Sequence, residues 1–264
     1  LKTDTIVFNV PVKDSDATDV DEITVSTVAK TFKESSSGYT ADFYDIDDYP
    51  TIVVAYGAKA DLDESTRLFV ISKVTTGNNE NGTSVQRFYG YQEGEYVNAY
   101  ASEDGVDVLV KGVENNSYEV KAGDVVIFSL DLKGDIDKVN VLMTAEEAAE
   151  LKNDQANAGD YTFVTGDADE AANYFGWAKA KASSSRLTLQ FAGDTTETIM
   201  FKGTYNVYNV NLNRSTPVVS VSSYGDIDVG ENRPGRDTDY VFVRMFEGNV
   251  VDAVVYTFTL DSAK

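Results

Sequence analysis

The chain lacks cysteine and histidine entirely, and both absences exclude chemistry. Without cysteine there is no thiolate nucleophile, no disulfide and no thiolate-bound zinc or iron–sulfur cluster. Without histidine there is no imidazole base, so neither a Ser-His-Asp triad nor an HExxH metal site can form. No GxGxxG or Walker motif occurs, and the serine runs at 35–37 and 183–185 do not lie in GxSxG. The sequence therefore gives no indication of nucleotide binding or of a serine hydrolase.

Positive charge is also scarce, with 22 Lys and Arg against 44 Asp and Glu, for a net charge of −22. Such a chain repels polyanions, so we expect no nucleic-acid partner. No run of 18 apolar residues exists, so no membrane span is predicted in this fragment. The chain opens at Leu1 without a basic and apolar leader, and we interpret it as a fragment of a longer precursor or a mature chain.

Alternating patterns rich in Val, Ile, Thr, Tyr and Phe dominate the sequence from end to end. Gly-containing turn clusters separate them at short intervals, and only 4 prolines interrupt the chain. This predicts an all-β protein with minor α content, organised as two or three small barrel-like or sandwich-like subdomains. The expected divisions are 1–68, 69–143 and 144–264, the last beginning with a helical connector.

Two segments depart from the strand pattern. Residues 144–156, TAEEAAELKNDQA, combine helix-forming residues with a capping box made by Thr144 and Glu147, so a helix is predicted there. Residues 166–175, GDADEAANYF, suggest a shorter helix capped by Asp167.

Internal similarity indicates a repeated β-hairpin module, against the alternative of chance matching between short β patterns. Residues 124–141 and 239–256 each read as an acid, an alternating strand, a Gly turn and a second Val/Ile strand. Residues 48–56, DYPTIVVAY, resemble the first strand of that unit. Residues 2–10, KTDTIVFNV, resemble residues 202–210, KGTYNVYNV, at a separation of 200 residues. Since both faces of the hairpin at 124–141 are apolar, we expect it either to be buried on both sides or to sit in a barrel wall against a neighbour.

Three segments carry a resemblance to a known group of proteins: FVISKVTTGNNENGTSVQRFYGY at 69–91, KAGDVVIFSLDLKGDIDKVNVL at 121–142 and FGWAKAKASSSRLTLQF at 175–191. They resemble the β-rich, non-anchoring region that follows the S-layer-homology (SLH) repeats in exported proteins of clostridia-like Gram-positive bacteria. The resemblance implies an extracellular, cell-wall-associated segment without catalytic residues. It also implies that the partners are envelope components or neighbouring copies of the same protein.

Carboxylate clusters are candidates for a weak calcium site, because calcium prefers oxygen ligands. Around Gly134 the candidate ligands are Asp131, Asp135 and Asp137. None of the acidic clusters fits an EF-hand loop, and the alternative is a solvated acidic surface. No other cofactor is expected.

Tyrosines gather in the segment 88–100, where Tyr89, Tyr91 and Tyr96 are candidates for carbohydrate contact. The alternative is that these rings serve packing, because tyrosine is a favoured strand residue. The sequence thus predicts a non-enzymatic structural or adhesive segment of an S-layer-type surface protein. A carbohydrate-binding module is the alternative, and a glycoside hydrolase with an acid pair ranks third.

Overall fold

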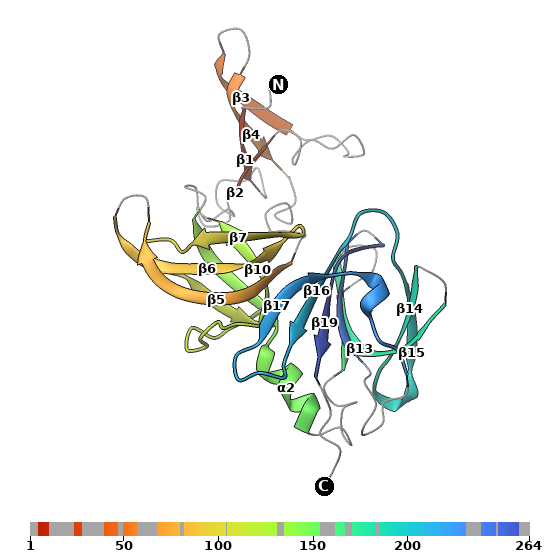
Figure 1. Cartoon of the computed structure of the whole chain (residues 1–264). Coiled ribbons are helices and arrows are strands. Elements are labelled where there is room, and N and C mark those ends of the chain that lie inside the picture. Colours follow the sequence, from red (N-terminus) through yellow and green to blue (C-terminus); the bar gives the residue numbers. More distant parts are fainter. Residues whose placement is uncertain are drawn as a thin grey trace. The chain divides into compact units, whose positions relative to one another are not determined.

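The computed structural model describes residues 5–10, 24–27, 40–46, 50–56, 68–79, 82–103, 105–130, 135–153, 162–166, 171–182, 185–230, 239–246 and 248–258 (Figure 1). The chain divides into two compact units. Residues 1–65 and 128–137 form the first unit, and residues 66–127 and 138–264 form the second. The predicted division near residue 68 lies close to this junction, whereas residue 143 falls inside the second unit.

The first unit contains a four-stranded sheet in the order β2-β1-β4-β3. Strands β1 and β4 are parallel, and the outer pairs β1–β2 and β3–β4 are antiparallel. Its buried cluster consists of Val7, Val53 and Ala55, with Ala41 packed against it. The strands are β1 (Ile6–Val10), β2 (Thr24–Thr27), β3 (Thr40–Ile46) and β4 (Pro50–Tyr56).

The second sheet has seven strands in the order β7-β6-β5-β10-β11-β8-β9 and lies in the second unit, except that the end of β10 and the start of β11 fall within residues 128–137 of the first unit. An antiparallel meander, β5 to β7, adds to the sheet through β5, which pairs with β10. Strand β11 follows β10 and pairs in parallel with β8. The strands are β5 (Phe69–Asn78), β6 (Ser84–Gln92), β7 (Glu95–Tyr100), β8 (Asp107–Val110), β9 (Val113–Glu114), β10 (Val125–Leu130) and β11 (Ile136–Met143).

The third sheet repeats this arrangement in the order β15-β14-β13-β18-β19-β16-β17, with β12 added beside β13. The meander β13 to β15 joins β18, the β18–β19 pair is antiparallel, and β19 is parallel to β16. The strands are β12 (Phe163–Gly166), β13 (Ala171–Lys181), β14 (Arg186–Gln190), β15 (Thr196–Met200), β16 (Asn206–Asn211), β17 (Val218–Ser222), β18 (Tyr240–Phe246) and β19 (Asn249–Thr257).

Backbone hydrogen bonds show that the second and third sheets are two copies of one module. The amide of Ile71 donates to the carbonyl of Asp124 at 2.9 Å, and the amide of Ala178 donates to the carbonyl of Asp239 at 2.9 Å. The β5–β6 register shifts directly after Ile71, and the β13–β14 register shifts directly after Ala178. The repeated hairpin predicted from the sequence is confirmed, and it is part of a larger seven-stranded repeat.

The sheet of the first unit matches four strands of this module. Ile6 pairs with Ile52 in β1–β4, and Asn206 pairs with Asp252 in β16–β19, so each pair is displaced by 200 residues. The similarity predicted between 2–10 and 202–210 therefore reflects the same position in the fold. The prediction that segment 48–56 resembles the first strand of the hairpin is wrong. Its strand β4 occupies the position of β19, the second strand, because it pairs in parallel with β1.

One helix, α2 (Ala145–Asn153), confirms the prediction for residues 144–156 within its described part. The prediction of a second helix, at 166–175, is wrong for the described part of that segment, because Gly166 ends β12 and residues 171–175 form a strand, while residues 167–170 lie outside the described residues. Ala171 to Phe175 belong to β13, which lies between neighbouring strands and pairs with β18 along its length. The ring of Phe175 belongs to one apolar cluster and the ring of Tyr174 to another, on opposite sides of the strand. The burial of these rings outweighs the helix propensity of the alanines.

The second unit holds two large hydrophobic clusters. The shared cluster combines side chains of both modules and of α2, among them Val70, Ile127, Ala148, Phe242 and Tyr256. The internal cluster lies on the other face of the third sheet and includes Val207, Val241, Val243 and Ala253. Residues 125–128, which alternate between the two faces of β10, are all buried, so the two-sided burial expected for the hairpin at 124–141 is confirmed for this strand.

The prediction of an all-β protein with minor α content is confirmed. The three sheets mix parallel and antiparallel pairs, and none closes into a barrel over the residues that the structure describes. No helix in the described part of the chain has the length and apolar character needed to cross a membrane.

Candidate functional site

One face of the first meander gathers the predicted tyrosines into a single surface, which we call the tyrosine face. Direct partners across β6–β7 are Arg87 with Tyr100, Tyr89 with Asn98 and Tyr91 with Tyr96. Because side chains alternate along a strand and direct partners share a face, these three pairs line one side of the sheet. In Figure 1 strands β5 and β6 form a long curved hairpin, and β7 pairs with β6.

Arg87 organises the outer part of the tyrosine face. Its guanidinium carbon lies 4.9 Å from the ring centroid of Tyr89 and 4.6 Å from that of Tyr100. Its Nε and one terminal nitrogen donate to Oδ1 of Asn98 at 3.0 and 2.7 Å. A guanidinium held by two rings and an amide keeps the neighbouring aromatic rings in defined positions.

Tyr91 and Tyr96 meet edge to face at the inner end of the tyrosine face, with ring centroids 5.1 Å apart. The two residues differ in exposure, because Tyr91 packs against the shared cluster and Tyr96 is 56% exposed. The Ser72 hydroxyl donates to the Tyr96 hydroxyl at 3.3 Å. The structure thus brings all three predicted tyrosines onto one surface, while Tyr91 serves mainly packing.

Tyr100 belongs to the tyrosine-rich segment 88–100 noted in the sequence, whereas sequence reasoning missed Arg87 and Asn98 as parts of this surface. The signal for them was their position in the strand register, because each lies directly opposite another member of the face. Flat aromatic rings bordered by an amide and a guanidinium are suited to contact a sugar, since the rings bind apolar C–H faces and the polar groups bind hydroxyls.

The predicted calcium ligands receive no support as a group. Asp131 lies outside the described residues, Asp135 directly precedes β11, and Asp137 is the second residue of that strand. Within the described residues, no cluster of three Asp or Glu side chains has the arrangement of a metal site. A calcium site at these aspartates stays a prediction.

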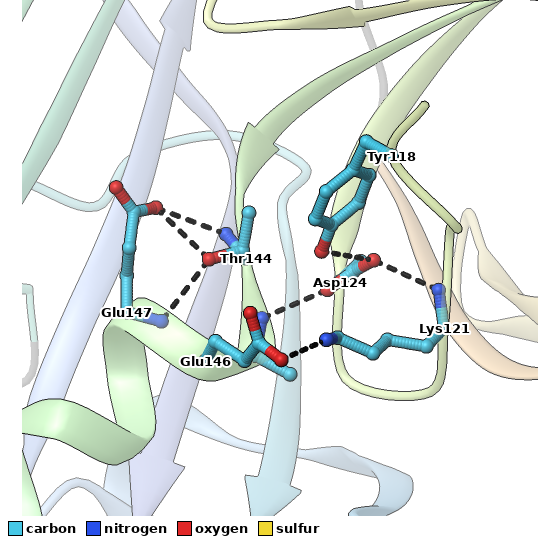
Figure 2. A network of polar contacts seen from close by, with 7 residues as sticks. Tyr118, Lys121, Asp124, Thr144, Glu146 and Glu147 are labelled. Carbon is cyan, nitrogen blue, oxygen red and sulfur yellow. Dashed lines mark hydrogen bonds and ion pairs between the residues drawn. The ribbon is translucent and has the colours of Figure 1, made fainter. Parts of the chain in front are cut away.

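A second polar cluster, the α2 network, surrounds the buried carboxylate of Asp124 (Figure 2). One of its oxygens accepts from the amide of Lys121 at 2.9 Å and from the hydroxyl of Tyr118 at 3.0 Å. The other oxygen accepts from the amide of Ala145, the first residue of α2, at 2.8 Å. Asp124 therefore ties the start of the β10–β11 hairpin to the N-terminus of the helix.

Burial dominates the electrostatics of this network. Removal from water raises the pKa of Asp124 to about 6, against the opposing effect of the hydrogen bonds from Ala145, Lys121 and Tyr118. The pKa of Tyr118 is also raised, first by its own burial and then by the nearby charge of Asp124. Lys121 forms an ion pair with Glu146 at the surface of the network. The groups hold one another in place, and the role that this geometry supports is structural.

A surface depression of about 290 Å³ lies beside β15 and the β18–β19 turn. Its described lining contains one carboxylate, that of Glu197, together with Lys202 and several apolar side chains. A glycoside hydrolase needs two carboxylates facing one another, so the described lining offers only half of such a pair. The depression is therefore not the best candidate for a functional site.

No protein-family model matches the chain, and no curated protein and no solved structure matches it significantly. The repeated module and the tyrosine face are consequently the observations from which function is argued.

Proposed function

We propose that the chain is a non-catalytic, architectural segment of an exported, cell-wall-associated surface protein, in contact with envelope components or with neighbouring copies. The supporting observation is that two consecutive seven-stranded modules share one hydrophobic cluster. Such packing joins successive modules into one rigid piece of chain, as a load-bearing or spacing segment requires. The acidic composition and the resemblance to the region beyond SLH repeats support the same proposal.

The buried carboxylates of the second unit agree with an architectural role. The Asp252 carboxylate accepts from the amide of Leu68 at 2.8 Å and from the side-chain amide of Asn206 at 3.0 Å. It therefore connects the segment that leads into the first module with the parallel pair of the second module. The Asp239 carboxylate likewise accepts from the amide of Asp228 at 2.7 Å. These acids bind backbone and side-chain amides, which is a structural use of charge.

The location is tested by labelling intact cells of the organism that produces the protein with an antibody against the folded chain. We expect labelling without permeabilisation, and loss of the signal after brief treatment of intact cells with an external protease. An antibody against a cytoplasmic protein serves as the control for cell integrity. Labelling that appears only after lysis would contradict the proposal.

The tyrosine face supports a second candidate function, binding of a carbohydrate. The specific observation is that Tyr89, Tyr96 and Tyr100 lie on one surface with Arg87 and Asn98, and that Tyr96 is exposed. Stacking on such rings contributes to sugar affinity without requiring a deep pocket.

The test is a glycan array probed with the wild-type chain and with the variants Tyr96→Ala and Tyr89→Ala. We expect the wild-type chain to bind at least one glycan class on the array. We expect Tyr96→Ala to bind the same glycans with an affinity lower by about tenfold or more, which corresponds to about 1.4 kcal/mol. Tyr44→Ala is the matched control, because Tyr44 is also half exposed but lies in the first unit. Equal binding by all three variants would exclude the tyrosine face as the site.

A further inference from the structure

The sheet of the first unit ends, among the described strands, at β3. In both complete modules the strand at this position has a neighbour on each side. Strand β10 lies between β11 and β5, and strand β18 lies between β19 and β13. Both added neighbours are antiparallel and are the first strand of a three-stranded meander.

The position-by-position match between β3 and β18 makes this comparison specific. Thr40 pairs with Tyr56 as Tyr240 pairs with Tyr256, and Phe43 pairs with Val53 as Val243 pairs with Ala253. The first unit therefore carries the counterparts of β16, β17, β18 and β19, whereas its described residues contain no counterpart of β13, β14 and β15.

Side-chain exposure along β3 agrees with a missing neighbour. Phe43 is 48% exposed, whereas its counterpart Val243 is fully buried in the internal cluster. Tyr44 is 49% exposed, whereas its counterpart Arg244 is only 5% exposed. Half-exposed aromatic rings on an edge strand are a surface that proteins normally cover, because such an edge otherwise pairs with other chains.

The buried cluster of the first unit is also consistent with a missing meander. Val7, Val53 and Ala55 of the first unit occupy the positions of Val207, Ala253 and Val255 in the internal cluster of the second module. In the second module the meander adds further apolar side chains to that cluster, among them Tyr174, Ala178, Leu187, Leu189 and Ile199. The described cluster of the first unit therefore contains the counterparts of residues from β16 and β19, but no counterparts of the residues that the meander contributes.

We propose that the outer edge of β3 is a strand-accepting surface that binds a three-stranded antiparallel meander of the β13–β15 type, supplied by the same polypeptide ahead of β1. The order of elements supports a donor in cis, since the meander precedes the parallel strand in both complete modules. By the same register, the first meander strand places its counterpart of Tyr174 opposite Phe43.

The test grafts a second copy of residues 171–200 directly ahead of Leu1 in the full chain, so that Met200 precedes Leu1 as it precedes Phe201. Hydrogen exchange is followed in peptides that cover β3. We expect exchange slower by about tenfold or more than in the ungrafted chain, because paired edge amides leave solvent. The control graft carries Tyr174→Pro and Phe175→Pro, since adjacent amides point to opposite edges and one of the two prolines must remove a donor toward β3.

A disulfide provides a second readout in this cysteine-free chain. Phe43→Cys combined with Tyr174→Cys in the grafted copy is expected to form a cross-strand disulfide. Phe43→Cys with Phe175→Cys is not expected to form one, because the two side chains point to opposite faces. Unchanged exchange together with no disulfide overturns the proposal. Protection of β3 in the ungrafted chain that rises with protein concentration also overturns it, because that result assigns the edge to a second copy.

Discussion

Buried aspartates in the second unit act as acceptors for backbone amides. Asp124 and Asp239 stand at the same point of the repeated module, directly before the hairpin. Each accepts from a backbone amide earlier in the chain, that of Lys121 three residues before Asp124 and that of Asp228 eleven residues before Asp239. A charge buried in this way is stabilised only while its hydrogen-bond donors stay in place.

Asp124 predicts a specific pH dependence of stability. Because its pKa is raised to about 6 in the folded chain, the stabilisation that it contributes is complete below its unfolded pKa and is lost as pH rises through 6. Relative to Asp124→Asn, the free energy of unfolding of the wild type is expected to fall by about 2 kcal/mol between pH 4 and pH 7. Urea unfolding of both proteins across this range measures the difference.

Asp226 is the matched control with the opposite sign. It is exposed, and hydrogen bonds from the side chain and backbone of Ser223 lower its pKa. Its contribution is therefore present above its unfolded pKa and lost as pH falls, so the comparison of wild type with Asp226→Asn should change in the other direction. A wild-type advantage over Asp124→Asn that grows with rising pH would show that the hydrogen bonds outweigh burial at Asp124.

Two buried tyrosines of the shared cluster give a second prediction at this scale. No described residue hydrogen-bonds to the hydroxyl of Tyr256, whereas the hydroxyl of Tyr208 accepts from the amide of Gly94 at 3.1 Å. Tyr256→Phe should raise the free energy of unfolding by about 1 kcal/mol, and Tyr208→Phe should lower it by about 1 kcal/mol. Thermal unfolding of the two variants measures both, and destabilisation by Tyr256→Phe would contradict this account.

At the scale of elements, α2 depends on the capping box that the sequence indicated. The Glu147 amide donates to Oγ1 of Thr144 at 3.0 Å, and the Thr144 amide donates to the Glu147 carboxylate at 3.3 Å. We expect Thr144→Ala to lower the free energy of unfolding by about 1 kcal/mol, because an orphan helical amide loses its acceptor. Thr144→Ser keeps the hydroxyl and should recover most of the loss. Equal loss in both variants would show that the methyl group, and not the cap, is responsible.

The same elements show what the sequence could predict. Helix α2 (Ala145–Asn153) was predictable because its signals, a cap and helix-forming residues, are local. The strand at 171–175 was not, because its alanines favour a helix and only pairing with β18 and burial of Phe175 select the strand. The position of DYPTIVVAY in the repeat was also not predictable, since parallel pairing between β1 and β4 is a contact distant in sequence.

At the scale of the whole chain, short repeated patterns in the sequence indicated the hairpins but not the seven-stranded module. The first strands of the two meanders, FVISKVTTGN and AANYFGWAKAK, share little sequence, although their bulges lie at the same place. Tyr89, Tyr91 and Tyr96 were identified as a group because they are close in sequence. The contribution of Arg87 depends on cross-strand register, which the composition does not reveal.

The central claim, that one strand arrangement recurs along the chain, is tested most directly by cross-linking pairs of engineered cysteines with a short bimane reagent that carries two thiol-reactive groups. The variant Ile6→Cys/Ile52→Cys probes the parallel pair of the first unit, and Asp107→Cys/Lys138→Cys probes that of the first complete module. We predict efficient cross-linking of both pairs and poor cross-linking of the register-shifted pairs Ile6→Cys/Val54→Cys and Asp107→Cys/Asn140→Cys. Cross-linking of the shifted pairs in preference to the matched pairs would contradict the account.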